Sequence, residues 1–317
     1  MTSYTHQLSP EQAATLEALV RNGGYVMREV PYARFSGAKT DHNVTFYTSG
    51  KLVVQGKGTK DFVEFVLEPQ VLGAATLGYE TVLDPTLLDP RIGVDESGKG
   101  DFFGPLCVAA VYVNANVLQA WSGQGIRDSK KVSSDAQIAK LAKTIRETPG
   151  CVVNTVAIGN EAYNRMHTAN GSVNRVLAWG HARVIENLLS QPQRLEPFPK
   201  RAISDQFSAD KGTVERALMG LGKKLELVQR HQAETDLAVA AASILARHEY
   251  VSRLAALEKQ YGVPLPKGAS AAVEAAGKAL VERHGTDALS KVAKLHFRTS
   301  YRVLGLPEPE KVDWVKR

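Results

Sequence analysis

The sequence predicts an α/β protein in which a mixed β-sheet is flanked by helices, preceded by a smaller α+β domain. Apolar segments that suit buried strands alternate with helical patterns from about residue 90 onward, which is typical of α/β domains. Two Asp-Pro steps, at residues 84–85 and 89–90, break regular structure between this part and the first. We therefore predict two domains, residues 1–83 and 90–317.

The composition is that of an ordinary globular protein. The chain has 317 residues, of which 44% are hydrophobic and 23% charged. No apolar run approaches the ~18 residues of a membrane span, and the N-terminus is too polar for a signal peptide. Two cysteines, Cys107 and Cys151, give neither a disulfide framework nor a zinc-site spacing. We predict a cytoplasmic protein without a membrane partner.

The charge is unevenly distributed along the chain. The formal net charge is +6 and the isoelectric point is about 9.2, which favours a polyanionic partner. Residues 1–80 contain 7 Lys and Arg against 8 Asp and Glu, whereas the remainder contains 32 against 25. The basic excess therefore belongs to the second part, and the first part has a net charge of −1.

The first part is predicted to be a small α+β domain. Its expected elements are a helix over residues 10–22, strands over 25–30, 43–47 and 51–55, and a helix over 59–68. A Thr-Ser-Gly turn joins the last two strands, and Pro69 is expected to end the second helix.

The second part is predicted to alternate strands and helices. Its expected elements are a strand pair over residues 92–113, strands over 151–158, 202–204 and 225–229, and helices over 133–147, 172–189, 234–249, 270–283 and 287–296.

The most informative segment is residues 92–101, an apolar run that ends in Asp95 and Glu96 and continues as a glycine-lysine-glycine turn. A second apolar strand follows at once. Adjacent carboxylates at the end of a core strand are costly unless a positive charge lies against them. A divalent cation such as Mg²⁺ is the simplest partner, because hard cations bind carboxylate oxygens.

Two further acids are candidates for the same site. Asp205 ends a short strand, where α/β proteins place their ligands. Glu234 and Asp236 both begin the next helix. At ~100° per residue, Glu234 lies about 50° from the centre of the apolar stripe and Asp236 about 110° from it. We therefore expect Glu234 to face the sheet and Asp236 to face solvent.

Four converging carboxylates would repel one another and raise one another's pKa values. Two divalent ions ~3.5–4 Å apart would relieve that repulsion, activate a water and stabilise the leaving oxygen of a phosphodiester. The same segment nearly matches the phosphate-binding loop of nucleotide hydrolases, but Gly100 stands where that loop has the hydroxyl that binds Mg²⁺. We therefore favour a two-metal site.

The neighbouring residues suit a nucleic acid. Gly98 and Gly100 would let backbone amides approach a sugar or phosphate closely, and Lys99 adds a positive charge. Such a turn could read the 2′-hydroxyl that separates RNA from DNA. Ser129 and Lys130 belong to an Asp-Ser-Lys-Lys element that would add two lysines on a nearby loop.

These features together resemble the type 2 ribonucleases H. The resemblance rests on four elements in the same order: the pair Asp95-Glu96, the turn over residues 98–100, the element over 128–131 and the Ala-Ala-Ser-Ile helix sequence over 241–247. Within that family the chain is similar to the HIII branch, because of its N-terminal domain, Lys99 in place of an arginine, residues 101–105 and a Glu as fourth acid.

The resemblance implies an RNase H-like fold with a TATA-binding-protein-like N-terminal domain. It implies endonucleolytic hydrolysis of the RNA strand of RNA/DNA hybrids, with Mg²⁺ or Mn²⁺, leaving 5′-phosphate and 3′-hydroxyl ends. We expect a monomer without a protein partner. The resemblance assigns metal binding and catalysis to Asp95, Glu96, Asp205 and Glu234, and contact with the hybrid backbone to Gly98, Lys99 and Gly100.

The family role of the N-terminal domain is substrate binding, which a near-neutral domain must achieve through a local patch. Lys51, Lys57 and Lys60 cluster on one strand and the turn after it. Phe46 or Tyr47 could stack on a base or sugar, although core packing is the better expectation for Phe46.

Two other functions stay open: cleavage 5′ of a single ribonucleotide in duplex DNA, as in the HII branch, and hybrid binding without catalysis. The N-terminal domain and Lys99 argue against the first, and the presence of all four acids argues against the second. His248 and His296 lie near the predicted site helices, but neither is assigned a role.

Overall fold

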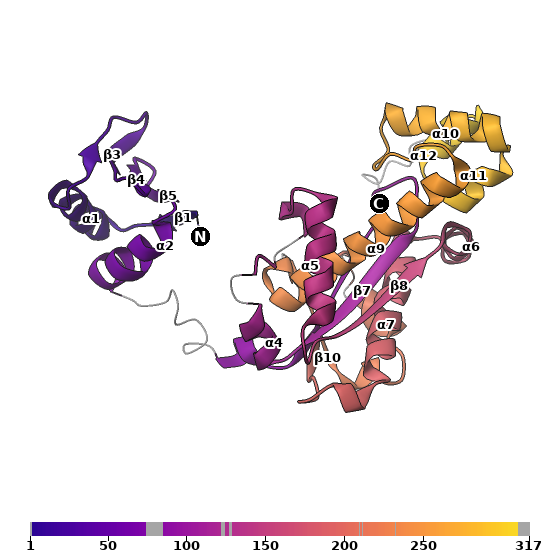
Figure 1. The fold of residues 1–317 in the computed structure, drawn as a ribbon, viewed down its shortest axis with the longest axis horizontal. Coiled ribbons are helices and arrows are strands. Elements are labelled where there is room, and N and C mark those ends of the chain that lie inside the picture. Colours follow the sequence, from indigo (N-terminus) through magenta and orange to yellow (C-terminus); the bar gives the residue numbers. More distant parts are fainter. Residues whose placement is uncertain are drawn as a thin grey trace. The chain divides into compact units, whose positions relative to one another are not determined.

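The computed structural model describes residues 2–73, 85–121, 124–126, 129–208, 210, 212–231 and 233–309. The chain divides into two compact units, Met1–Leu88 and Asp89–Arg317 (Figure 1). Within the described ranges, no helix is both long enough and apolar enough to span a bilayer.

The N-terminal unit is an antiparallel sheet with helices packed against one face. The strands are β1 (Ser3–Gln7), β2 (Val26–Met27), β3 (Ala33–Ala38), β4 (His42–Tyr47) and β5 (Lys51–Gly56), in the sheet order β1-β5-β4-β3-β2. The helices are α1 (Pro10–Asn22), α2 (Thr59–Phe62) and a π-helical continuation of α2 over Val63–Leu72. A short 3₁₀ turn, Pro85–Leu88, ends the unit.

Alternation along the strands separates a core face from an open face. Val44 and Phe46 of β4 are buried in a core that also contains Leu16 of α1, so Phe46 serves packing, as expected. Thr45 and Tyr47, which alternate with them along β4, are only half-buried. The helices therefore cover one face of this sheet and leave the other open.

Three expectations for this unit need correction. The strand expected over residues 25–30 is reduced to two residues, and β1 and β3 were not predicted because their sequences are short and largely polar. Pro69 does not end the second helix, which continues to Leu72 as a π-helix. The wider π turn accommodates the proline ring, which in an α-helix would clash with the carbonyl four residues earlier.

The second unit is built on a mixed five-stranded sheet, so the predicted α/β class is confirmed. Its strands are β6 (Arg91–Ser97), β7 (Leu106–Val113), β8 (Val152–Ile158), β9 (Arg201–Asp205) and β10 (Glu226–Arg230), in the order β10-β9-β6-β7-β8. β6, β7 and β8 are antiparallel, whereas β9 runs parallel to both β6 and β10.

Helices and short helical turns surround this sheet. The α-helices are α4 (Ala115–Ala120), α5 (Asp135–Glu147), α6 (Asn160–Asn170), α7 (Val173–Leu189), α8 (Gly212–Ala217), α9 (Leu237–Tyr261), α10 (Ala271–His284), α11 (Asp287–Val292) and α12 (Arg298–Leu304). The 3₁₀ turns are Ser129–Lys131, Pro192–Arg194, Gly222–Lys224 and Ala233–Thr235. Of these helices, α4, α6, α8 and α12 were not predicted.

Helices α7 and α9 cover opposite faces of the sheet. Ile92 and Val94 of β6 pack in one core with Ala182 and Ile185 of α7. Gly93, between them, faces α9: a Cβ at this position would lie 2.1 Å from the carbonyl carbon of Ala238. Successive residues of β6 therefore point alternately toward the two helices.

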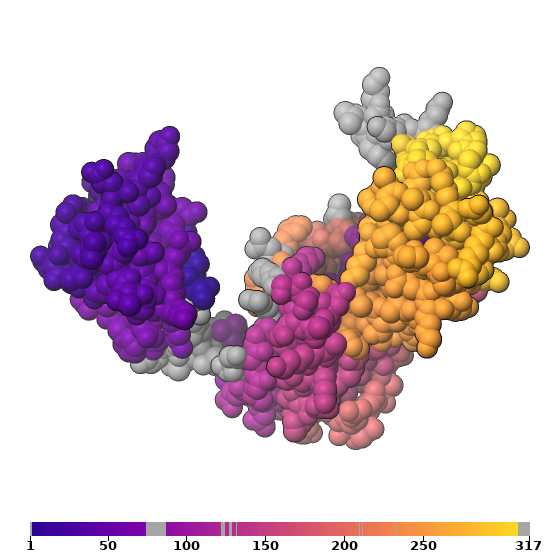
Figure 2. Space-filling view, turned by 45° about the horizontal axis from the view of Figure 1, so that its top comes forward, coloured from indigo at the N-terminus to yellow at the C-terminus, as the bar shows by residue number. Residues whose placement is uncertain are grey.

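The C-terminal helices pack against the second half of α9. Phe102, Tyr250 of α9, Val273 of α10, Leu289 of α11 and Val303 of α12 share one buried core. Figures 1 and 2 show these helices, coloured orange to yellow, as a compact cap on this end of α9. The cap fixes the chain that follows the glycine-lysine-glycine turn.

Replacing Gly93 by alanine is expected to lower the free energy of unfolding by at least about 3 kcal/mol, because the new methyl would meet backbone atoms of α9 that cannot move aside. Urea unfolding of the second unit would measure the loss. Gly159→Ala is the matched control: its Cβ meets open space, and its cost should stay within about 0.5 kcal/mol. Equal stabilities of the two variants would contradict the close packing.

Candidate active site

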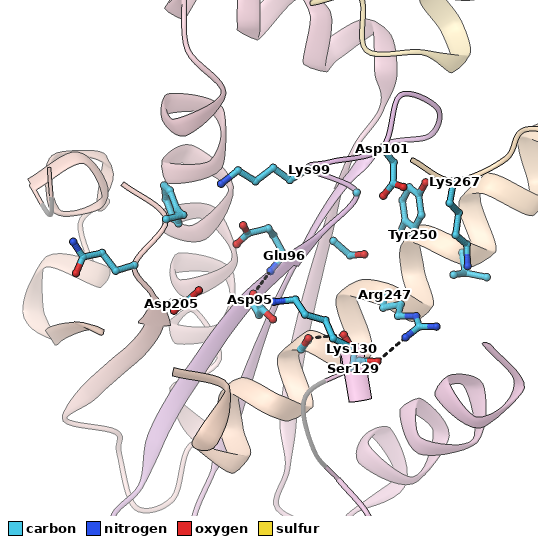
Figure 3. A pocket seen from close by; sticks show the side chains of 16 residues that line it. Asp95, Glu96, Lys99, Asp101, Ser129, Lys130, Asp205, Arg247, Tyr250 and Lys267 are labelled. Atoms are coloured by element: carbon cyan, nitrogen blue, oxygen red, sulfur yellow. Dashed lines mark hydrogen bonds between the residues drawn. The ribbon is translucent and has the colours of Figure 1, made fainter. Parts of the chain in front are cut away.

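The cleft that contains the predicted acids has a volume of about 630 Å³ and lies at the carboxyl ends of β6 and β9. Figure 3 shows Asp95, Glu96 and Asp205 around this cleft, with Lys99 and Lys130 reaching toward them. The structure thus brings three of the four predicted acids together. The other charged residues that line the cleft are Asp101, Arg247 and Lys267.

Asp95 is on the face of β6 that α9 covers. Its Oδ1 accepts a hydrogen bond of 2.9 Å from the backbone N–H of Glu96. Burial, and then the negative charge of Glu96, raise the pKa of Asp95 to about 8, against the opposing effects of Ser243 and Lys130. Without a cation, this carboxyl therefore holds its proton near neutral pH.

Glu96 points to the opposite face, toward α7. The Nε2 atom of His181 lies 3.0 Å from Glu96 Oε2. Burial opposes the charged form of Glu96, but the hydrogen bond from His181 and the charges of Lys99 and Lys130 outweigh it. The pKa of Glu96 is therefore lowered, and the two adjacent carboxyls differ in protonation.

Asp205 is the last residue of β9, which runs parallel to β6 and pairs Ser204 with Val94. The register places Asp205 beside the Asp95-Glu96 pair. Asp205 Oδ1 is buried and has no hydrogen-bond partner among the described residues. An orphaned buried carboxylate oxygen next to two other carboxyls is the kind of group that a cation would satisfy.

The donor set fits a hard divalent cation, since it consists of carboxylate oxygens. In the described ranges, however, no three Asp, Glu, His or Cys side chains are already grouped as a metal-holding set. The cleft therefore supplies the right ligand chemistry without a preformed ligand shell, and a cation would draw the carboxyls together.

The expected orientation of Asp236 is wrong. α9 begins at Leu237 rather than at residue 234, and Asp236 is its N-cap, accepting a hydrogen bond of 2.8 Å from the N–H of Ala238. The Asp236 carboxylate also pairs with Arg91 at 2.8 Å and is only 8% exposed. The helical wheel failed because capping, not helix periodicity, decides the direction of a residue before the first turn.

Glu234 lies on the 3₁₀ turn Ala233–Thr235, which packs against β9 and the start of α9. It is half-buried and does not line the cleft. The commitment of Asp236 to its cap and to Arg91 favours Glu234 over Asp236 as the candidate for the fourth acid.

The two glycines of the turn have different roles. Gly98 has a φ of +91°, and a Cβ there would lie 2.5 Å from the carbonyl oxygen of Pro105, so the backbone itself requires glycine. Gly100 is exposed and a Cβ there would meet open space. Lys99 between them extends over the ring of Phe207, with Nζ 5.6 Å from the ring centroid.

The loop with Ser129 and Lys130 is fastened to α9. The Ser129 and Ser243 hydroxyls are 2.7 Å apart, and Arg247 donates to the carbonyl oxygens of Ser129 and Val132 at 2.5 and 3.2 Å. Ser129 is buried, so its hydroxyl secures the loop, while Lys130 lines the cleft.

Several residues in the cleft or beside it were not singled out from the sequence. Ser243 and Arg247 belong to the Ala-Ala-Ser-Ile helix sequence, where polar residues in an apolar helix were the available signal. His181 gave the same signal within the helix over residues 172–189. Neither His248 nor His296 lines the cleft; burial, and then His167 and Lys294, lower the pKa of His296 to about 4.

Lys51, Lys57 and Lys60 are exposed residues of the N-terminal unit. Lys51 lies on β5, Lys60 on α2 and Lys57 between them. They remain candidates for a separate contact with substrate.

Comparison with known proteins places the whole chain in one family. A family model described as Ribonuclease HII matches residues 92–300, and one described as Domain of unknown function (DUF3378) matches residues 6–72. Ribonuclease HIII of Chlamydia muridarum is 43% identical over 305 residues, 96% of this chain and 98% of the relative. Ribonuclease HIII of Protochlamydia amoebophila is 43% identical over 282 residues, 89% and 90% of the two chains.

A solved structure extends this agreement to three dimensions. The crystal structure of Bst-RNase HIII in complex with Mn²⁺ is 27% identical, with a TM-score of 0.65 over 96% of this chain and 98% of that one. The matched relatives include the N-terminal unit as well as the unit that carries the acids. The chain belongs to the ribonuclease HIII family.

Proposed function

We propose that the cleft at the ends of β6 and β9 is where this endoribonuclease H cuts the RNA strand of RNA/DNA hybrids, leaving 5′-phosphate and 3′-hydroxyl ends. The activity on hybrids follows from membership of the family. The assignment of that activity to Asp95, Glu96, Asp205 and Glu234 is the new element of the proposal.

One observation carries the assignment: three carboxyls from two adjacent strands line a cleft that also contains Lys99 and Lys130. One carboxyl has an elevated pKa and another has a buried oxygen without a partner among the described residues. Such a group of acids is unfavourable by itself and becomes favourable with bound cations. Acids that serve only the stability of the fold would have no reason to converge in one cleft.

The Mn²⁺ complex of Bst-RNase HIII supports Mg²⁺ or Mn²⁺ as the cofactor of this chain. Two such ions would be held by the four acids. The bound ions would supply a water of lowered pKa and stabilise charge on the leaving 3′-oxygen. Asp95, Glu96 and Asp205 would hold them at the strand ends, with Glu234 as the fourth ligand.

The remaining cleft residues position the nucleic acid. Lys99 and Lys130 offer positive charge to the phosphates on either side of the scissile bond. The exposed backbone at Gly100 allows a sugar to approach closely, which suits recognition of a 2′-hydroxyl. A requirement for RNA in the cleaved strand would follow from that contact.

The N-terminal unit would bind the hybrid through the open face of its sheet, since its net charge of −1 gives no general attraction for a polyanion. The half-buried Thr45 lies on this face, and its hydroxyl is 2.8 Å from that of Ser36, which is buried. Lys51 borders the face on β5, whereas Lys57 follows β5 and Lys60 lies on α2. Polar side chains with nearby lysines suit contacts to sugars and phosphates.

We expect the wild-type protein with Mg²⁺ or Mn²⁺ to cut a continuous RNA/DNA hybrid at several positions and to leave duplex DNA with one ribonucleotide intact. Asp95→Asn, Asp205→Asn and Glu234→Gln should each lower kcat on the order of 100-fold or more, because each removes a metal ligand. End-labelled substrates resolved on denaturing gels would measure both points.

Asp236→Asn is the control for Glu234→Gln. It should lower stability through Arg91 while leaving kcat of the folded protein near that of the wild type. If Asp236→Asn lowered kcat and Glu234→Gln did not, Asp236 would be the fourth acid. Efficient cutting 5′ of a lone ribonucleotide would instead support the HII-type activity, and binding without cleavage would reject catalysis.

Reversing the charge of Lys51, Lys57 and Lys60 together is expected to raise KM for a long hybrid on the order of tenfold and to leave kcat within about twofold, because these lysines contact substrate away from the reacting bond. Steady-state kinetics at two salt concentrations would show the effect shrinking as salt rises. Arg21→Glu on α1, an exposed cation outside this group of lysines, is the control. An unchanged KM in the triple variant would exclude this patch.

Asp95→Asn is expected to stabilise the metal-free protein, and more so at about pH 9 than at about pH 6. The folded protein holds the Asp95 proton up to a pKa of about 8, above the value in an unfolded chain, so the wild type loses stability as pH rises toward 8. The amide of the variant carries no such penalty. The difference in free energy of unfolding between the variant and the wild type can grow by at most about 1.4 kcal/mol per pH unit.

Thermal unfolding in chelator at several pH values would measure this difference. Added Mn²⁺ should raise the midpoint of the wild type and have little effect on the variant. Parallel profiles of stability against pH for the two proteins would show that the pKa of Asp95 is not raised in the folded state.

The proposed reaction involves neither a membrane nor a second protein. That the enzyme is monomeric and cytoplasmic stays a prediction. The mass of the particle in solution would test whether it is a monomer.

A further inference from the structure

His181 is a buried histidine that touches one of the proposed catalytic acids. It lies on α7, is 0% exposed, and its Nε2 is 3.0 Å from Glu96 Oε2. The residues are 85 positions apart in the chain, so this contact exists only because α7 is packed on the sheet. The adjacent Gly180 allows that close packing: a Cβ there would lie 2.8 Å from Val108 Cγ2 on β7.

The surroundings of the imidazole define which nitrogen donates. His181 Nδ1 is buried and has no partner among the described residues. A hydrogen on Nδ1 would therefore be a buried donor without an acceptor, whereas a hydrogen on Nε2 points at a carboxylate. The geometry assigns the proton to Nε2, and His181 donates to Glu96.

The second contact of His181 reaches the other acid-bearing strand. The ring of Phe207 meets the imidazole edge-on, with centroids 5.0 Å apart and an interplanar angle of 65°. Phe207 follows Asp205, the end of β9, by two residues. Lys99 in turn lies over the Phe207 ring. His181 thus contacts both Glu96 and the segment that carries Asp205.

We propose that His181 is a positioning residue that holds Glu96 Oε2 and packs against Phe207, so that the Glu96 carboxylate and the segment that carries Asp205 are oriented toward a divalent cation. The inference rests on the proposed catalytic role of Glu96. Oε2 accepts one hydrogen bond from His181, and the remaining lone pairs of the carboxylate stay available to a cation or a water. A carboxylate fixed in this way loses less rotational freedom when it binds metal.

A purely structural histidine would act differently. It would satisfy its own buried nitrogen and affect stability, but it would not change cation affinity. The two roles therefore separate in a measurement of Mn²⁺ binding, which is independent of turnover.

The experiment compares His181→Leu, which removes the donor, with His181→Gln, whose amide can donate from nearly the same position as Nε2. Titration calorimetry with Mn²⁺ alone and steady-state kinetics on a hybrid would be measured for both. For His181→Leu we expect Mn²⁺ binding and kcat to fall by about 10- to 100-fold, with KM for the hybrid within about twofold. His181→Gln should recover most of both losses.

Leu188→Ala is the matched control, because Leu188 is buried on the same helix and packs in the α7 core without a recorded contact to Glu96. It should lower the unfolding midpoint and leave Mn²⁺ affinity unchanged. Wild-type Mn²⁺ affinity in His181→Leu would overturn the inference. An equal loss of Mn²⁺ affinity in folded His181→Gln would also overturn the inference, because a donor at this position would then have no effect on Mn²⁺ binding.

A spectroscopic measurement keeps the inference testable if His181→Leu does not fold. In the wild type, the Nε2 proton of His181 should give a protected, downfield imidazole signal in the metal-free protein, and Glu96→Ala should abolish that signal. Its absence from the wild type would overturn the inference. Activity of Glu96→Gln separates the two hypotheses: an active variant rejects the proposed role of Glu96, whereas an inactive variant beside a fully active His181→Leu rejects only the role of His181.

Discussion

The repulsion between Asp95 and Glu96 is the constraint around which the second unit is organised. Two adjacent carboxyls at the end of a buried strand cannot both be charged without support from their surroundings. The structure resolves this by giving them different environments, which leave Asp95 with a pKa of about 8 and keep the pKa of Glu96 low. The neighbouring lysines and the buried hydrogen-bond donors favour the charged forms of these carboxyls.

The alternation of a β-strand is what makes the different environments possible. Asp95 and Glu96 are neighbours in sequence, so they project to opposite faces of β6. α9 supplies Ser243 on one face, and α7 supplies His181 on the other. Both helices approach closely because glycines, Gly93 and Gly180, lie at the contact points. The packing of the core and the chemistry of the cleft therefore depend on the same two helices.

Local sequence patterns predicted those parts of the fold that local physics decides. The alternation of strands and helices, the acidic pair at a strand end and Asp205 at the end of β9 could all be read from the chain. The direction of Asp236 was missed because a helical wheel ignores the N-cap, and because Arg91, 145 positions earlier, pairs with the same carboxylate. The contact of His181 could not be predicted, since a histidine in an apolar helix gives no sign of which strand it will meet. A long-range partner therefore decides the contact of His181 entirely and the direction of Asp236 in part.

The protonation of Asp95 links the metal-free and metal-bound forms of the cleft. A protonated Asp95 lowers the repulsion that the empty arrangement would otherwise suffer, so the unit can fold before a cation arrives. A divalent ion that binds Asp95 must displace this proton, and its affinity must therefore rise with pH until Asp95 is ionised. Glu96, already charged and held by His181, gives the ion a first ligand that needs no deprotonation. The asymmetry of the pair thus provides both a stable apo state and a ready point of entry for the cation.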